Sequence, residues 1–577
     1  MLTVALSLAC LQAASDDAAA SAANVLPIER EAHEASRGAG PWPLTVAEAS
    51  SFKRSSRLDE VEAFLDALDA LPAADRFYRE VFGRTTEGGD VIAVTASAGK
   101  DERGEPDRSG RANVIVNANI HGGEIEGKVA VQILLRELAL GYHADLLEEL
   151  CITFVPVFNV DGNDRIARTN RVSQNGPDGG VGERANGMGL DLNRDFVKLE
   201  TPEVQALTWL VGRLDPIAFF DLHTTNGSSH GYDLTYSPSL SPNAAPQMDA
   251  YARGSFFPGI RARLAERAEV YVYDYGNFRY PPRDRGSRGQ RGDPIAWATY
   301  DSRPRFGTNL VGLRDTLSIL SEAYSYLPYD RRVDATYAFV LECLRTIARE
   351  RGEIERRIAD ARASRVDASG DPTWMLGVDC ELVPGESVPI RVGEVSTVEI
   401  DLEPREEGFQ AGRRRVAAGP DAVRLVEMQA RVAFAPTRNV EVGREFVVVA
   451  PSEVTLRALQ IHLGRVPRVL KESRTLELRV FDVAEAKRNQ RPFQGHREVS
   501  VEGAWRTATI DVPAGSLVVP CTPLTAHLLH PESDDSLTTW NYFDEALFPE
   551  GGGASEAQIV HPAAIAAVAI DEQSAGR

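Results

Sequence analysis

Apolar and polar positions along the first part of the chain follow two alternating periods. Short apolar runs typical of buried strands occur at 111–121, 150–159, 217–223 and 316–324. Between the first two runs, "GKVAVQILLRELAL" repeats its apolar side chains with the helical period. Strands and helices in alternation predict an α/β fold, with a mixed central sheet covered by helices on both faces. In such a sheet the carboxyl ends of the strands carry the functional site.

The pattern of apolar and polar residues changes after a long, charged helix predicted at about 334–364. Beyond about Asp371, short β-like runs such as "SVPIRVGEV" and "RTLELRVFDV" are separated by Pro, Gly and charged turns. A β-rich or α+β accessory region is therefore expected after the α/β unit. We predict four segments: a signal segment or disordered tail at 1–40, the α/β domain at 41–365, the accessory domain at 371–550, and a tail at 551–577.

The first residues resemble an export signal that lacks its basic front. An apolar run extends from Leu2 to Ala14, yet the first basic residue is Arg30. The prediction is export to a periplasmic or extracellular location, with a cytoplasmic location as the alternative. Export would permit a disulfide, for which we expect Cys380 and Cys521, against the alternative of isolated buried thiols. The rest of the chain has no apolar run of membrane-spanning length, so no transmembrane helix is predicted.

Charge and cysteine content narrow the classes of partner and site. The 577 residues include 84 acidic and 63 basic side chains, giving a net charge of −21. This balance repels the phosphate backbone of nucleic acids, which we therefore exclude as partners. The five cysteines form no CxxC pair, which excludes a zinc site built from thiolates.

A candidate metal site combines residues from two strand ends. His121 and Glu124 follow an apolar strand in "NANIHGGEIEG", where two glycines let the backbone turn sharply. About a hundred residues later, His223 ends the apolar strand of "IAFFDLHTTNG". Two histidines and a carboxylate suit zinc, and three protein ligands leave a fourth position open for water, as in catalytic zinc sites.

A base and several cations complete the expected chemistry. Glu322, in "TLSILSEAYSYLPY", ends a further apolar strand and is placed to take a proton from a metal-bound water. Arg168, Arg171 and Arg194 fall in loops. One such arginine can stabilise an oxyanion, and another can hold a substrate carboxylate in a bidentate pair. Asn193, beside Arg194, can add a directional hydrogen bond.

The fragments "HGGE", "NVDG…RTNR", "LDLNRDF", "DLHTT" and "SEAYSY", in this order, resemble the zinc carboxypeptidase family (peptidase family M14, funnelin-type metallocarboxypeptidases). The match covers roughly residues 45–350, so residues 41–365 are expected to be the catalytic domain. The resemblance implies one zinc ion per chain, held by the ligands predicted above, with Glu322 as the general base. It also implies that Asn193 and Arg194 hold the substrate's terminal carboxylate and that Arg168 polarises the scissile carbonyl. Tyr300 is the candidate for the tyrosine that caps the substrate.

The resulting hypothesis is a zinc metallocarboxypeptidase that acts on peptides with a free C-terminal carboxylate. One alternative is a zinc-dependent amidase or deacylase acting on acylated amino acids or cell-wall peptides. The other is a non-catalytic, peptide-binding relative. Three further residues are candidates for the site. His230 is a candidate for lining the cleft, against an ordinary loop role. Arg303 and Arg305 are candidates for contacting an acidic substrate group, against a surface role.

Overall fold

The computed structural model describes residues 42–225, 227–281, 292–367, 370, 372–405, 408–537 and 565–568. The predicted signal segment lies outside these residues, as does most of the predicted tail. Within the described part of the chain, no helix is both long enough and apolar enough to cross a lipid bilayer.

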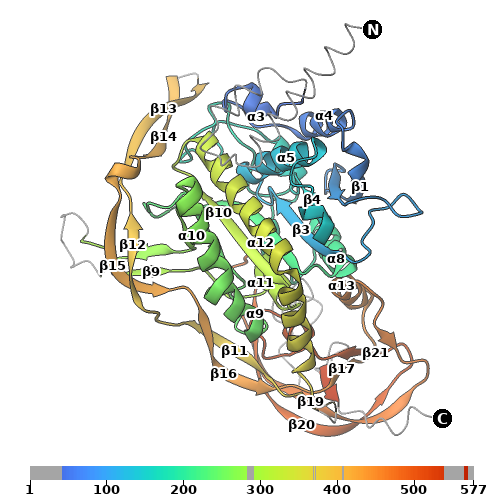
Figure 1. The fold of residues 1–577 in the computed structure, drawn as a ribbon. Helices are drawn as coiled ribbons and strands as arrows, with labels where there is room; N and C mark the ends of the chain where they lie inside the picture. Colours follow the sequence, from blue (N-terminus) through green and yellow to red (C-terminus); the bar gives the residue numbers. More distant parts are fainter. Residues whose placement is uncertain are drawn as a thin grey trace.

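An eight-stranded mixed sheet forms the centre of the first part of the chain (Figure 1). Its strands are β1 (Phe77–Arg84), β2 (Asp90–Ala96), β3 (Ala112–Ala118), β4 (Leu150–Val155), β5 (Ala218–Thr225), β6 (Leu234–Ser237), β7 (Val272–Asp274) and β10 (Leu317–Tyr324). They are arranged in the order β1-β2-β4-β3-β5-β10-β6-β7. The four central strands, β4, β3, β5 and β10, run parallel. The predicted α/β fold with a mixed sheet is therefore confirmed.

Helices cover both faces of this sheet because the central strands are apolar on both sides. On one face, Val114 and Val116 of β3 pack in a core with helices α4 (Leu58–Leu68), α5 (Glu126–Ala139), α10 (Phe257–Ala268) and α12 (Tyr329–Ala363). On the other face, Ile115 packs in a second core with α8 (Pro202–Leu214) and α11 (Gly307–Gly312). The short helices α3 (Val46–Ala49), α6 (Leu146–Glu149), α7 (Val160–Asp164) and α9 (Pro246–Tyr251) lie in the connections.

The part of the chain after α12 is rich in strands, as predicted. These are β11 (Met375–Leu382), β12 (Ser387–Val392), β13 (Val395–Arg405), β14 (Gly408–Ala417), β15 (Arg424–Arg431), β16 (Phe434–Glu441), β17 (Glu445–Val448), β18 (Arg468–Val469), β19 (Arg474–Arg488), β20 (Val499–Val512) and β21 (Leu517–Pro520). Two helices, α13 (Glu453–Leu463) and α14 (Pro523–Leu529), interrupt them. Residues Ile565–Val568 of the predicted tail form β22, which pairs with β17.

The two parts of the chain share a sheet and a core. Strand β15 pairs on one side with β12 and on the other with β9 (Ala296–Ala298), which in turn pairs with β8 (Asn277–Arg279). Apolar residues of the later part, among them Phe446 and Leu459, belong to the second core beneath the large sheet. Figure 1 shows the later strands bordering the first part along one side and continuing beneath it.

The cysteines differ from one expectation. Cys380 and Cys521 are free thiols rather than a disulfide, and Cys151 and Cys343 are free and buried. Burial raises the pKa of the Cys521 thiol to about 12, which keeps it protonated and unreactive.

Candidate active site

Three neighbouring strands deliver the predicted metal ligands and base to one edge of the sheet. His121 follows β3, whereas His223 lies in β5 and Glu322 in β10. Because β3, β5 and β10 are adjacent and parallel, their carboxyl ends meet at this edge. In the register of β10 on β5, Glu322 is the direct partner of His223.

The loop that carries His121 and Glu124 is held closed by its own residues. Asn119 adopts a left-handed conformation, with φ 64°, and its Nδ2 donates to the carbonyls of His121 and Glu124 at 3.1 and 3.0 Å. A Cβ on Gly122 would come within 2.2 Å of the carbonyl carbon of Gly162. This glycine is therefore required by close packing against another loop, rather than by the sharp turn expected from the sequence.

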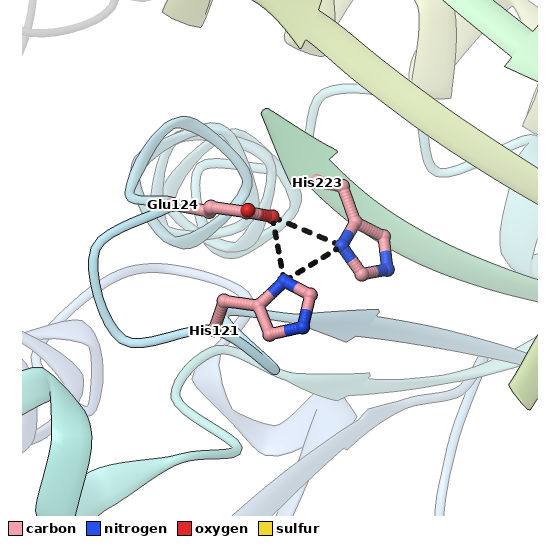
Figure 2. A group of neighbouring side chains, drawn as sticks. All are labelled: His121, Glu124 and His223. Carbon is pink, nitrogen blue, oxygen red and sulfur yellow. Dashed lines mark hydrogen bonds and ion pairs between the residues drawn. The ribbon is translucent and has the colours of Figure 1, made fainter. Parts of the chain in front are cut away.

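The side chains of His121, Glu124 and His223 converge on one point, as Figure 2 shows. Their facing atoms are the two Nδ1 atoms, 3.3 Å apart, and Oε2 of Glu124, which lies 3.1 and 2.9 Å from them. Donors about 2.0–2.2 Å from a tetrahedral zinc ion stand about 3.3–3.6 Å from one another. The three facing atoms would therefore hold a zinc ion after small adjustments.

Both histidines are oriented by carboxylates on their far side. Nε2 of His121 lies 2.9 Å from Oδ1 of Asp191, and Nε2 of His223 lies 2.8 Å from Oδ2 of Asp221. Such carboxylate partners fix the ring orientation and strengthen the ring as a metal ligand. Burial opposes a charge on His223, but Asp221 and Glu124 outweigh burial and raise its pKa well above the ordinary value. Both aspartates were absent from the predicted site, although "DLH" places Asp221 and His223 on the same face of β5.

Glu322 is placed in an environment that favours its neutral form. Its carboxyl is buried beside the metal ligands, and burial raises its pKa to about 8, with a further contribution from the charge of Glu124. His223 and Arg171 act in the opposite direction. A carboxyl poised between its two forms near neutral pH is suited to taking up a proton and releasing it again.

Arg184 is a site residue that the sequence reasoning missed. Its Nε and Nη2 donate to Oδ2 of Asp191 at 3.0 and 2.7 Å, and its Nη1 lies 3.6 Å from Oε1 of Glu124. The side chain is half-exposed, so it lines the cavity instead of being sealed beneath it. Its place in "GERANGMGLDLNRDF", just ahead of Asp191, was the signal available in the sequence.

Arg168 and Arg171, the two arginines of "RTNR", lie outside the lining of the cavity that contains the candidate ligands. Nη1 of Arg171 pairs with Oε1 of Glu124 at 2.9 Å and its Nη2 donates to the carbonyl of Thr224 at 2.9 Å, so this residue supports a candidate metal ligand. Arg168 lies farther out, and its Nη1 donates to the carbonyl of Leu402 at 3.0 Å. The structure thus places Arg184, rather than Arg168, beside the converging ligands.

Asn193 and Arg194 lie next to each other on the wall of the cavity. Oδ1 of Asn193 accepts a hydrogen bond of 2.8 Å from the backbone of Gly307. The Arg194 guanidinium lies over the ring of Phe306, 4.0 Å from its centroid. Burial, together with the charges of Arg184 and Arg305, lowers the pKa of Arg194. A bound anion would stabilise this crowded cation.

Tyr300 also faces the cavity. Its hydroxyl lies 3.2 Å from Oγ1 of Thr308, and its ring meets those of Tyr275 and Phe306 edge-on. Tyr275, which was not predicted, lines the same space. Two tyrosines therefore line the cavity where the sequence predicts one substrate-capping tyrosine.

His230, Arg303 and Arg305, the three further candidates, pack against or pair with other parts of the protein. His230 is packed among aromatic rings, and burial lowers its pKa to about 3. Arg303 is paired with Asp301, and Arg305 with Asp535 at 2.8 Å. All three lie outside the lining of the cavity that contains the ligands.

A cavity of about 150 Å³ connects the groups that do face one another. It is lined by His121, Glu124, Arg184, Asn193, Arg194, His223, Thr224, Thr225, Tyr275, Tyr300, Phe306, Leu320 and Glu322. A larger cavity of about 590 Å³ shares Tyr300 with it and is lined on its other side by the later part of the chain. The metal-ligand set, the candidate base and two cations thus share one small space.

Residues 61–254 match the family model described as zinc carboxypeptidase. Carboxypeptidase D of Mus musculus is 34% identical over 146 residues, which are 22% of this chain and 10% of that protein. Carboxypeptidase D of Homo sapiens is 29% identical over 210 residues, 31% of this chain and 15% of that protein. The matched segments therefore span only a small part of these relatives.

Solved structures with detectable similarity include two bacterial proteins. A putative carboxypeptidase A from Shewanella denitrificans has 19% identity and a TM-score of 0.37, covering 51% of this chain and 69% of its own. A metallo-carboxypeptidase from Burkholderia cenocepacia has 17% identity and a TM-score of 0.37, covering 52% and 70%.

Proposed function

Residues 61–254 of this chain belong to the zinc carboxypeptidase family, and on that premise we propose that the protein removes C-terminal residues from peptides. One observation carries the proposal: the metal-ligand set, Glu322 and Arg194 line the same cavity. The cavity, at about 150 Å³, is smaller than the roughly 300–1,000 Å³ of ordinary ligand pockets. Such a space suits the end of a chain better than its middle.

The metal would be held by His121, Glu124 and His223. Zinc bound there supplies Lewis-acid activation of water and of the scissile carbonyl. Asp191 and Asp221 keep the two imidazoles turned toward the ligand position, while Arg171 neutralises the outer oxygen of Glu124.

Glu322 is the group that moves the proton. Its carboxylate takes a proton from the attacking water and delivers it to the leaving nitrogen, so the peptide bond breaks without a charged amide leaving group. A raised pKa favours the second step, because the protonated acid must persist until the nitrogen departs. Arg184, anchored on Asp191, donates hydrogen bonds to the oxyanion that forms on the carbonyl.

The substrate's terminal carboxylate is assigned to Asn193 and Arg194. Arg194 offers a guanidinium on the cavity wall, stacked on Phe306, and its planar fork matches a carboxylate. Tyr300 and Tyr275 also line the cavity, and their hydroxyl groups are assigned to hydrogen bonds with the substrate.

A matched pair of peptides tests the proposal. We expect zinc-loaded protein to release the last residue of a peptide with a free carboxylate, read by mass spectrometry. The same peptide with a C-terminal amide should react at least about a hundredfold more slowly, because the amide offers Arg194 no carboxylate to bind. Arg194→Gln should raise KM for the free-carboxylate peptide. Arg213 is an exposed residue of α8 that pairs with Glu80, and Arg213→Gln should leave KM unchanged.

The outcome separates the alternatives. Equal cleavage of both peptides, or cleavage at internal bonds, would exclude the exopeptidase. Faster hydrolysis of acylated amino acids, assayed in parallel, would favour a deacylase.

A further inference from the structure

The hairpin of β19 and β20 reaches from the later part of the chain to the wall of the candidate active site. At its tip, Oε1 of Gln494 accepts a hydrogen bond of 2.8 Å from the backbone N–H of Asp191. These residues are 303 positions apart in the sequence. The contact therefore joins the accessory region to the loop that holds Asp191, Asn193 and Arg194.

Asp191 connects three parts of the site. Its Oδ1 lies 2.9 Å from Nε2 of the metal ligand His121 and accepts from the backbone of Asn193 at 3.0 Å. Its Oδ2 accepts from Arg184. A shift of the Asp191 backbone would move a metal ligand, the candidate oxyanion donor and the carboxylate-binding turn together.

Gln494 is an unusual residue for the backbone conformation of its turn. Phe493 and His496 pair across it, and both central residues have positive φ, 51° for Gln494 and 83° for Gly495. Two-residue turns of this type favour Asn, Asp or Gly at the first central position. A glutamine is disfavoured in this conformation, and its longer side chain is what spans the distance to Asp191.

The same hairpin makes further contacts with two loops next to the cavity. His496 lies 2.8 Å from Glu200, on the loop that follows Arg194. Glu498 accepts from Arg305 at 2.5 Å, on the loop that carries Phe306. The hairpin therefore contacts the two loops between which Arg194 and Phe306 stack.

We propose that Gln494 is a positioning residue of the active site, which acts through Asp191 to hold His121 and Arg184 in place. The catalytic consequence rests on the proposed peptidase function. The consequence for metal binding does not, since His121 is a metal ligand whatever the substrate.

Three substitutions in the full-length protein separate the hydrogen bond from the turn. Gln494→Asn suits the turn better but is one methylene too short to reach Asp191. Gln494→Met keeps the length and lacks the acceptor. Gln494→Glu keeps both length and acceptor. Lys487→Ala removes an exposed ion pair with Glu502 in the hairpin stem and serves as the control.

The measurements are the zinc Kd by competition with a chelator, kcat and KM on a free-carboxylate peptide, and the thermal midpoint. The Asn and Met variants should bind zinc about two- to tenfold more weakly and lose kcat/KM by a similar factor, as expected for one lost hydrogen bond. The Asn variant should keep the wild-type midpoint. Gln494→Glu and Lys487→Ala should stay within twofold of wild type.

Unchanged zinc Kd in both the Asn and Met variants would overturn the proposal. So would a weaker Kd that appears only where the midpoint falls, because that result would reflect folding rather than positioning. If the wild-type protein binds zinc but cleaves no peptide, the proposed function fails while the zinc measurements still decide the role of Gln494.

Discussion

Glu322 is the direct Cα partner of His223 across the parallel pair β10 and β5. The candidate base and one candidate metal ligand are therefore positioned by the same hydrogen-bonded ladder rather than by separate loops. Rigid strand ends hold catalytic groups more accurately than loops do. A substitution of Glu322 is therefore the most direct test of the mechanism.

Replacing this carboxyl separates catalysis from metal binding. Glu322→Gln keeps the size and hydrogen-bonding capacity of the side chain but cannot accept a proton. We expect kcat to fall by about 10²- to 10⁴-fold, the usual contribution of a general acid–base, while the bound zinc, measured by elemental analysis, stays near one per chain. Wild-type turnover in this variant would remove Glu322 from the role of base.

Zinc affinity should depend strongly on pH. His223 has a pKa well above its ordinary value, and that of Glu322 is about 8. Zinc competes with the proton on His223, and ionised Glu322 adds a negative charge near the metal. Both effects point the same way, so affinity should increase as pH rises from 6 to 9.

Chelator competition at a series of pH values gives the apparent Kd. In Glu322→Gln the part of the pH dependence near pH 8 should be lost, because the amide does not titrate. An affinity that stays constant or weakens with rising pH would contradict the electrostatic description of the site.

The two arginines assigned to the same role can be compared directly. Arg184→Ala should lower kcat by about 10²- to 10³-fold, the typical effect of removing one oxyanion donor. Arg168→Ala should change kcat by less than about threefold, because its guanidinium binds the carbonyl of Leu402 outside the cavity. The reverse order in single-turnover assays would restore Arg168 to the catalytic role.

A buried ion pair behind the metal site should dominate local stability. Arg332 on α12 pairs with Glu126 on α5, both side chains being fully buried, and Glu126 also accepts from the Thr224 hydroxyl beside His223. Arg332→Met would leave the buried Glu126 carboxylate without its ion-pair partner and should destabilise the protein by about 3–5 kcal/mol.

Urea denaturation of metal-free protein measures that loss. Arg356→Met, on the exposed side of the same helix, is the matched control and should keep a midpoint close to wild type. A similar loss in both variants would show that helix propensity, and not the buried pair, is responsible.

The strand ends that carry the ligands could be predicted because their signal is local. His121, His223 and Glu322 each follow or end an apolar run, and parallel neighbouring strands bring such ends together. The alternation of strands and helices likewise predicts the α/β class.

Contacts across long sequence separations left no comparable signal. Arg168 and Arg184 lie on one irregular loop, and only the folded path of that loop brings Arg184, rather than Arg168, close to Glu124. The composition of residues 371–550 predicts an accessory domain, but it does not reveal that Phe446 packs into the same core as Phe219. Burial patterns show that a strand is covered but not which distant strand covers it.

The sheet that joins the two parts of the chain also sets an order of events during synthesis. Ala298 at the end of β9 has Arg431 of β15 as its partner, so one edge of β9 has no neighbour until that later strand has been made. At roughly 5–20 residues per second, the intervening chain takes on the order of ten seconds to emerge. For that time this edge of β9 lacks its partner strand, and an unpaired strand edge can pair with other chains.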